Sequence, residues 1–148
     1  MDIIIGSDHA GFDLKEECKA YLKGRPDYVV KDIGAFSRDS VDYPKVAHEL
    51  AQGIVKGEYG LGILICGTGL GMSMVANRYK GVRTALCHNI YTAKMSRMHN
   101  DANILAMGGR VTGVGLALEM LDVFLGTPFE GGRHQLRLDQ FDQKDLTA

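Results

Sequence analysis

Hydrophobic positions along the chain follow two alternating patterns. Short, largely apolar runs predict five strands, at residues 2–6, 28–33, 61–66, 83–88 and 103–107. Between and after these runs, apolar residues recur every three or four positions, which predicts helices over residues 12–23, 43–55, 70–81, 90–99 and 114–125. From about residue 132 the chain is polar, and the pattern indicates at most a short amphipathic helix in a C-terminal tail.

The regular alternation of strand and helix predicts an α/β fold, because parallel strands need helical crossovers that cover both faces of the sheet. We expect a single domain over residues 1–148, built as a three-layer α/β/α sandwich with a five-stranded parallel sheet of Rossmann-like type. A length of 148 residues fits one domain, and no linker, repeat or change of composition divides the chain.

The amino-acid composition and the net charge disfavour some classes of binding partner and of cellular location. The 17 Lys and Arg residues nearly balance the 18 Asp and Glu residues, so the net charge of −1 disfavours binding to nucleic acid or to an anionic membrane. No apolar run approaches the roughly 20 residues of a membrane-spanning helix, and we expect no signal peptide. The cysteines Cys18, Cys66 and Cys87 are odd in number and widely spaced, which favours reduced thiols and a cytoplasmic protein. Cys18 and Cys87 fall on apolar positions, so we expect both in the core.

The third apolar run ends abruptly in a glycine-rich loop that carries a thiol and a hydroxyl. Cys66 closes the run, and the loop consists of Gly67, Thr68, Gly69, Leu70 and Gly71. Glycines let the backbone turn sharply and expose its N–H groups, and a helix that starts at Leu70 favours an anion at its N-terminus. We interpret the loop as a cradle for a phosphorylated or oxyanionic substrate beside a reactive thiol, since thiols at helix N-termini ionise readily. The competing interpretation is a plain glycine-rich turn with a buried core cysteine.

Ligands of parallel α/β sheets bind at the carboxyl ends of the strands. That rule brings three segments to one edge of the predicted sheet: Asp8-His9, Cys66–Gly71 and Gly108–Arg110. The pair His99-Asn100 lies just before the fifth strand, and it should therefore lie near the opposite edge of its own subunit. Either the loop folds back, or a neighbouring subunit supplies this pair to the site.

Each of these polar residues could also have a purely structural role. Asp8 suits a helix N-cap. His99-Asn100 could form a helix C-cap, Tyr43 could be a packed loop aromatic, and Arg110 could be a solvated charge. Arg133 and Arg137 are four residues apart, so one helix face can present both to a single phosphate, although paired surface arginines are common. The His, Cys, Asp and Glu residues show no metal-ligand spacing, so no metal is expected.

Five motifs together carry a resemblance to a known family: GSDHAGF (6–12), DYP (42–44), ICGTGLGMS (65–73), SRMHNDANILAMGGR (96–110) and EGGRHQLR (130–137). In this order they closely resemble ribose-5-phosphate isomerase of the B type, a family that includes the galactose-6-phosphate and allose-6-phosphate isomerases. The resemblance runs from the first strand to about Arg137. It implies an intramolecular oxidoreductase that interconverts D-ribose 5-phosphate and D-ribulose 5-phosphate through an enediolate, in the pentose phosphate pathway, with no metal and no cofactor. It also implies homodimers, or dimers of dimers, whose sites draw on both subunits.

The resemblance implies roles for individual residues as well. Cys66 matches the catalytic base, which moves a proton between C2 and C1 of the open-chain sugar, and Thr68 with the N–H groups of residues 67–71 matches the part that holds the enediolate oxygens. His99 matches the residue assigned to opening the furanose ring, with Asp8 nearby. The positions that match sugar or phosphate contacts, or line the pocket, are Asp8, His9, Tyr43, Gly67, Thr68, Gly69, Leu70, Gly71, Asn100, Arg110, Arg133 and Arg137.

Three further functions stay open at the level of the sequence. The substrate could be a six-carbon sugar phosphate, because motifs do not reveal the depth of the pocket. The chain could also be a non-catalytic phosphate- or nucleotide-binding module of flavodoxin-like build, although a pure binder needs no combination of Cys66, Thr68 and His99 with paired arginines. In the third function, Cys66 is a nucleophile that forms a covalent intermediate.

Overall fold

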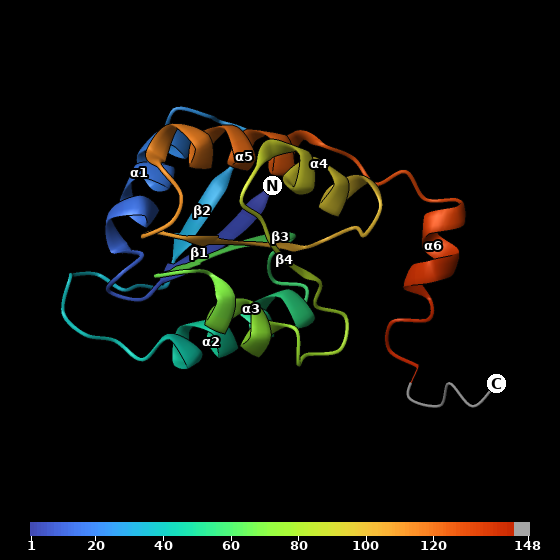
Figure 1. Cartoon of the computed structure of the whole chain (residues 1–148), viewed down its shortest axis with the longest axis horizontal. Helices are drawn as coiled ribbons and strands as arrows, with labels where there is room; N and C mark the ends of the chain where they lie inside the picture. Colours follow the sequence, from blue (N-terminus) through green and yellow to red (C-terminus); the bar gives the residue numbers. More distant parts are fainter. Residues whose placement is uncertain (144–148) are drawn as a thin grey trace.

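Five parallel strands form one sheet in the order β2-β1-β3-β5-β4 (Figure 1). The computed structural model describes residues 1–143. The strands are β1 (Asp2–Ser7), β2 (Val29–Asp32), β3 (Leu61–Cys66), β4 (Thr84–Leu86) and β5 (Ile104–Gly108). Every neighbouring pair runs parallel, so the predicted five-stranded parallel sheet is confirmed.

Helices cover both faces of this sheet. One face carries α1 (Phe12–Lys23), α4 (Ile90–Met98) and α5 (Val114–Gly126), and the other carries α2 (Tyr43–Val55) and α3 (Leu70–Ala76). The predicted three-layer α/β/α sandwich is therefore confirmed. The last helix, α6 (Arg133–Leu138), stands to one side of the layers (Figure 1). None of the helices in residues 1–143 is long and apolar enough to cross a membrane.

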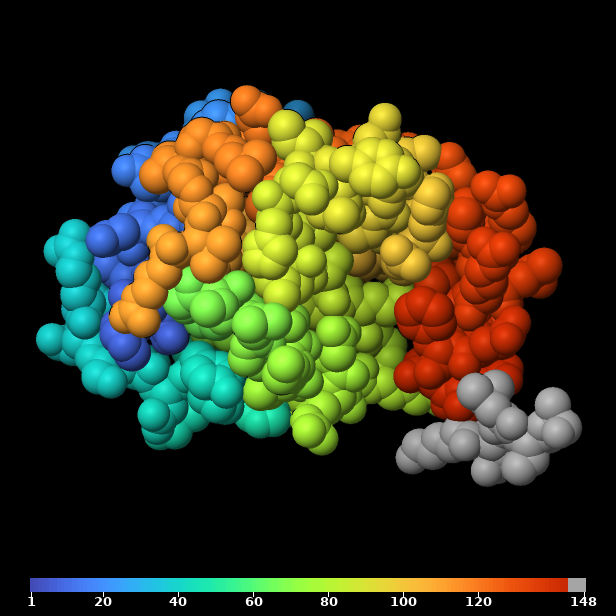
Figure 2. Space-filling model, in the orientation of Figure 1, coloured from blue at the N-terminus to red at the C-terminus, as the bar shows by residue number. Residues whose placement is uncertain are grey.

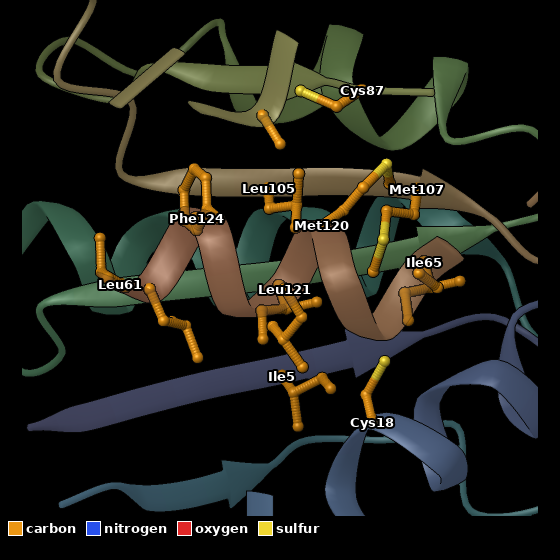
Figure 3. Packing of buried hydrophobic residues seen from close by; sticks show 14 of the residues in the cluster. Ile5, Cys18, Leu61, Ile65, Cys87, Leu105, Met107, Met120, Leu121 and Phe124 are labelled. Atoms are coloured by element: carbon orange, nitrogen blue, oxygen red, sulfur yellow. The ribbon is translucent and has the colours of Figure 1, made fainter. Parts of the chain in front are cut away.

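The central strand β3 is buried along its whole length, and its side chains enter two separate cores. Ile63 and Ile65 pack with side chains of α1, α4 and α5 in the larger core (Figure 3). Leu64 and Cys66 belong to the core formed with α2 and α3. A strand that is covered on both faces is apolar at every position, which explains the unbroken hydrophobic run in the sequence.

The two remaining cysteines lie in the larger core, as predicted (Figure 3). Burial raises the pKa of the Cys18 thiol to about 12, and the negative charge of Glu17 adds to the effect. Burial also raises the pKa of the Cys87 thiol. Both thiols are therefore protonated at neutral pH.

Two elements are clearly shorter than predicted. α3 ends at Ala76 rather than near Lys80. The next residue, Asn77, is tied to β4 by its side chain, so the helix does not extend past it. Its Oδ1 accepts the N–H of Thr84 at 2.7 Å, and its Nδ2 donates to the Thr84 carbonyl at 3.0 Å. The edge strand β4 has three residues rather than the predicted span of 83–88. The polar tail contains the short helix α6, in agreement with the short amphipathic helix that the sequence pattern allowed from about residue 132.

Candidate active site

Three loops meet at the carboxyl edge of the sheet, where the strand order changes direction. The chain leaves β1 toward β2 on one side and returns as β3 on the other, which creates the switch point at which such sheets bind ligands. The N–H of Asp8 donates to the carbonyl of Ile65 at 3.2 Å, and the N–H of Gly109 donates to the carbonyl of Cys66 at 2.8 Å. The three segments that the sequence predicted for this edge therefore lie side by side.

The loop after β3 wraps around the sulfur of Cys66. The N–H of Gly69 donates to the Cys66 Sγ at 3.1 Å, and this thiol is 4% exposed. Gly69 has a φ of +79°, and a Cβ there would lie 2.5 Å from Leu86 Cδ1 and 2.9 Å from the Met107 carbonyl carbon. Only glycine fits this position, and the turn that it allows aims a backbone donor at the sulfur. A backbone N–H thus faces the sulfur at the edge of the sheet where the three loops meet.

Thr68 and Asp8 stand on the two loops that flank this thiol. The Thr68 hydroxyl accepts the N–H of Leu70 at 3.2 Å and is exposed at the rim. Asp8 is 6% exposed, and its Oδ1 accepts the N–H of Gly11 at 3.0 Å. This contact closes the loop before α1 and makes no bond inside the helix, so Asp8 is a loop residue rather than the helix cap that the sequence also allowed.

His9 lies in the same loop, and its imidazole ring is bound through one nitrogen. Its Nδ1 lies 3.2 Å from the backbone nitrogen of Val41, which donates to it. A neutral imidazole that accepts at Nδ1 carries its proton at Nε2, so the second nitrogen is a donor. In that tautomer the imidazole has one donor, Nε2, available for a further hydrogen bond.

Tyr43 and Arg110 both lie against the glycine-rich loop. The Tyr43 ring lies against the glycine loop so closely that a Cβ at Gly71 would lie 2.5 Å from its Cζ. A Cβ at Gly67 would lie 3.6 Å from both Cδ and Nη1 of Arg110. The N–H of Arg110 also donates to the Gly67 carbonyl at 3.0 Å. The structure thus gathers a first group of predicted residues at the carboxyl edge: Asp8, His9, Tyr43, Cys66, Gly67, Thr68, Gly69, Leu70, Gly71 and Arg110.

The remaining predicted residues lie at the opposite, amino edge of the sheet. His99 caps the C-terminus of α4, and the following turn enters β5. The carbonyl of Asn103 in this turn accepts the N–H of Gly62 at 2.8 Å, beside the start of β3. β5 rises about 3.3 Å per residue, so at least about 13 Å of strand separates this turn from the Cys66 end. The loop does not fold back, and the predicted separation of His99 from Cys66 is confirmed.

α6 joins this second group. Arg133 and Arg137 both lie in the helix, four residues apart, so they share one face. The His99 ring stacks on that of His134, with centroids 4.2 Å apart and an angle of 13° between the rings. This stack and the bond from the Glu130 N–H to the Met98 carbonyl, 3.1 Å, hold α6 beside the end of α4. The second group therefore consists of His99, Asn100, Arg133 and Arg137.

His134 and Glu130 are two residues of this region that the sequence analysis did not single out. With His99 they form a group whose nitrogen and oxygen atoms lie within 4.8 Å of one another, the one such group of potential metal ligands in residues 1–143. The lone pair of an imidazole lies in the ring plane, so two nearly parallel rings do not converge on a common ion. Their only sequence signal is their place in the EGGRHQLR motif. The absence of a metal stays a prediction.

Comparisons with known proteins agree on one family. The Ribose/Galactose Isomerase family matches residues 3–141. Ribose-5-phosphate isomerase B of Escherichia coli is 47% identical over 137 residues, which cover 93% of this chain and 91% of the relative. The 4-deoxy-4-sulfo-D-erythrose isomerase of a Clostridium species is 46% identical over 130 residues, covering 87% and 81%.

A solved structure agrees as well. The ribose-5-phosphate isomerase B of Clostridium thermocellum superposes with a TM-score of 0.92 at 51% sequence identity, over 95% of this chain and 94% of that one. This likeness extends over both edges of the sheet. The thiol-bearing loop at the switch point and the matches along nearly the whole chain lead to one conclusion: this chain is an isomerase of the ribose/galactose isomerase family.

Proposed function

We propose that the chain interconverts D-ribose 5-phosphate and D-ribulose 5-phosphate through an enediolate, as a cytoplasmic enzyme of the pentose phosphate pathway. The observation that carries this proposal is the Cys66 sulfur, held 3.1 Å from the Gly69 N–H in a loop of backbone donors at the switch point. Relatives named ribose-5-phosphate isomerase B support the choice of the five-carbon substrate. Free thiols at all three cysteines support the cytoplasmic location.

In this mechanism Cys66 acts as the general base. Its thiolate takes the proton from C2 of the open-chain aldose and returns it to C1 of the enediolate, while the hydroxyl proton of O2 moves to O1. Together these transfers move the carbonyl from C1 to C2. The N–H groups of the glycine loop and the hydroxyl of Thr68 donate to the enediolate oxygens, and such preformed donors need no reorganisation when the charge appears. His99, supplied by a second copy of the chain, opens the furanose ring near Asp8.

Anion binding at the far end of the sugar sets its register over the thiol. His9 and Arg110 supply donors from the carboxyl edge, and Arg133 and Arg137 supply a pair of guanidinium groups from α6. Guanidinium groups bind phosphate in a two-pronged geometry, which favours arginine in this role. Asn100 and Tyr43 complete the contacts to the sugar.

A homodimer, alone or paired into a dimer of dimers, would complete the site. The two groups of residues lie at opposite edges of one chain, so a second copy is the simplest source of the missing half. Large apolar side chains of α3, of α4, and of α5 with the segment that leads into it are also exposed: Leu70, Met74, Ile90, Tyr91, Val111 and Val114. Figure 2 shows the green, yellow and orange segments next to one another on one face of the molecule. Exposed apolar clusters of this kind mark surfaces that bind a partner.

One observation favours a second candidate substrate class. A relative of 46% identity is named for 4-deoxy-4-sulfo-D-erythrose, a four-carbon aldose with a sulfonate at the end remote from the aldehyde. Ribose 5-phosphate shares this pattern of an aldehyde at one end and an anion at the other. The competing substrates are therefore aldoses of four or six carbons with a terminal anion, including allose 6-phosphate and galactose 6-phosphate.

A substrate panel tests the proposal. We expect turnover of ribose 5-phosphate, with the highest kcat/KM in a panel that includes allose 6-phosphate, galactose 6-phosphate and 4-deoxy-4-sulfo-D-erythrose, and no effect of EDTA on the rate. In deuterium oxide, label should enter C1 or C2 of the product, as proton transfer through an enediolate requires. Turnover of no aldose, or covalent trapping of the sugar on Cys66, would exclude the proposed reaction.

A further inference from the structure

The turn that presents His99 contains an unusual backbone conformation. Asp101 has a φ of +42°, and it is the one residue other than glycine with a positive φ in the part of the chain that the structure describes. Residues with a side chain seldom adopt this left-handed region, which is populated mainly by glycine and to a smaller extent by Asn and Asp. A turn kept in such a conformation must be held by its surroundings.

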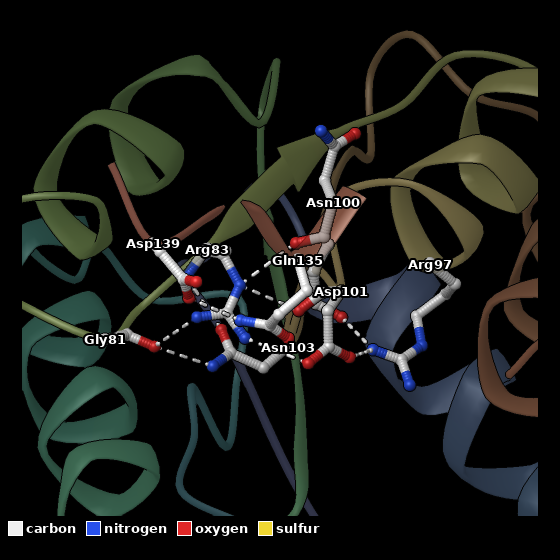
Figure 4. A network of polar contacts seen from close by, with 9 residues as sticks. Gly81, Arg83, Arg97, Asn100, Asp101, Asn103, Gln135 and Asp139 are labelled. Carbon is white, nitrogen blue, oxygen red and sulfur yellow. Dashed lines mark hydrogen bonds and ion pairs between the residues drawn. The ribbon is translucent and has the colours of Figure 1, made fainter. Parts of the chain in front are cut away.

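Two arginines hold this turn through the carboxylate of Asp101 (Figure 4). Nη2 of Arg83 donates to Oδ2 at 3.2 Å, and Nη1 of Arg97 donates to Oδ1 at 2.8 Å. The exposed fractions of the three side chains are 25% for Arg83, 14% for Arg97 and 35% for Asp101. We call these three residues the arginine clamp.

The same arginines also bind the backbone of the turn. Nε of Arg83 donates to the carbonyls of Asn100 and Asp101, both at 3.0 Å. Nη1 of Arg97 donates to the carbonyl of Ala102 at 2.6 Å. Three consecutive carbonyls are thus bound by side chains that come from different elements, since Arg97 belongs to α4 and Arg83 directly precedes β4.

From this network we infer that the arginine clamp is a positioning device for the proposed isomerase reaction. His99 and Asn100 directly precede Asp101, so their direction relative to the sheet depends on the backbone at 101. The clamp ties that backbone to α4 and to the sheet, and it holds the His99 ring where it stacks on His134. Asp101 touches no substrate in this scheme and acts through His99. The inference rests on the proposed function.

Asp101→Asn tests the clamp, because Asn keeps the size of the side chain and tolerates a positive φ but loses the charge that both arginines bind. We expect kcat on ribose 5-phosphate to fall by about 10-fold or more, since a misplacement of about 1 Å can cost 10²-fold. In a His99→Asn background the same substitution should lower kcat by less than about twofold, because its effect passes through His99. An equal loss in both backgrounds would mean that the clamp merely stabilises the fold.

A matched control comes from a second pair of Asp and Arg. Asp122 on α5 forms an ion pair with Arg25, whose Nη1 lies 2.5 Å from Asp122 Oδ1, and this pair joins α5 to the segment that follows α1. Neither residue belongs to the two groups of site residues. Asp122→Asn should keep kcat within about twofold of the wild type, while its loss of thermal stability is comparable to that of Asp101→Asn. A similar fall of kcat in both variants would overturn the inference.

Spectra of the histidine rings give a readout that does not need turnover. The His99 signal is the one that disappears in His99→Asn, and in Asp101→Asn it should shift as the stack with His134 loosens, while the signal of exposed His88 stays in place. If Asp101→Asn does not fold, Asp101→Gly is the second variant, because glycine adopts a positive φ but has no carboxylate for the two arginines to bind. The same results are expected for it. An unchanged His99 signal with full kcat would refute the clamp. A wild type that turns over no aldose would instead refute the proposed function.

Discussion

At the scale of single residues, the thiol of Cys66 differs from the two remaining thiols in what surrounds it. Cys18 and Cys87 lie in the larger core, and burial raises the pKa of each thiol. Cys66 ends β3 at the switch point and accepts a hydrogen bond from a loop glycine. Cys66 is therefore the cysteine to which we assign the proposed proton transfer.

Replacing Cys66 by Ser separates a catalytic thiol from a structural one. Serine keeps the shape, but its hydroxyl does not ionise usefully near neutral pH, so kcat should fall by about 10²-fold or more. KM and the melting temperature should change little, because the side chains are nearly isosteric. Steady-state kinetics and thermal unfolding give both quantities. Iodoacetamide should inactivate the wild type and spare Cys18 and Cys87, whereas a fully active Cys66→Ser enzyme would move the base elsewhere, with Asp8 the first residue to test.

At the scale of elements, a buried lysine joins α1 to β2. The Lys15 side chain is fully buried, and its Nζ lies 2.6 Å from Oδ2 of Asp32 and 2.8 Å from Oε1 of Glu16. Lys19 lies 2.6 Å from the same Asp32 oxygen. Burial alone would raise the pKa of Asp32, but hydrogen bonds from Lys15 and Lys19 outweigh it and lower the pKa below its ordinary value of 3.8.

Asp32→Asn should therefore destabilise the protein by about 3 kcal/mol at neutral pH, because it leaves the buried Lys15 ammonium without its main partner. A carboxylate with a lowered pKa stabilises the folded state above its ordinary pKa, and this contribution is lost as the pH falls through the lowered value. The gap in free energy of unfolding between wild type and variant should thus be full above about pH 4 and shrink in more acidic solution.

Urea unfolding over a series of pH values measures this gap. Asp13→Asn is the matched control, since Asp13 pairs with Arg38 at 2.7 Å but both side chains are more than two-thirds exposed. It should change stability by no more than about 1 kcal/mol. Equal effects of the two substitutions would show that burial of Lys15 does not strengthen its pair.

At the scale of the whole molecule, the two groups of site residues lie too far apart in one chain to form a single site, so the proposed site requires a dimer. Cys66 lies at the carboxyl edge of the sheet and His99 at the amino edge of the same chain, separated by the length of β5. A dimer with two-fold symmetry can bring the carboxyl edge of one chain to the amino edge of the second chain, and it then does so twice.

Mixing two inactive variants tests this arrangement. Cys66→Ala and His99→Ala chains, exchanged at equal concentration, should form heterodimers in which one of the two sites is intact. Random pairing then restores about a quarter of the wild-type activity. Each variant incubated alone is the control, and a mixture no more active than the separate variants would show that sites are not shared between subunits.

Much of the fold and half of the candidate site follow from local patterns. Strand and helix periodicities identify each strand and the helices up to α5, and loops that follow parallel strands must meet at one edge, which brings Asp8 and Arg110 to Cys66. The predicted end of α3 was wrong, because the Asn77 side chain binds the backbone of Thr84, a contact across the chain that no helical pattern contains.

The α/β/α sandwich and the carboxyl-edge group could be predicted from the sequence alone. The reason is that the spacing of apolar residues defines each strand and helix locally, and the alternation of strands with helices makes the strands parallel. Three further features emerge only when the chain is folded. α6 lies beside His99. Lys15 is buried, although a lysine in a helical pattern predicts an exposed position. Arg97 of α4 and Arg83, which precedes β4, bind the left-handed turn at Asp101. These features depend on which distant segments meet, and such meetings are set by the packing of the whole chain rather than by the pattern within any one segment.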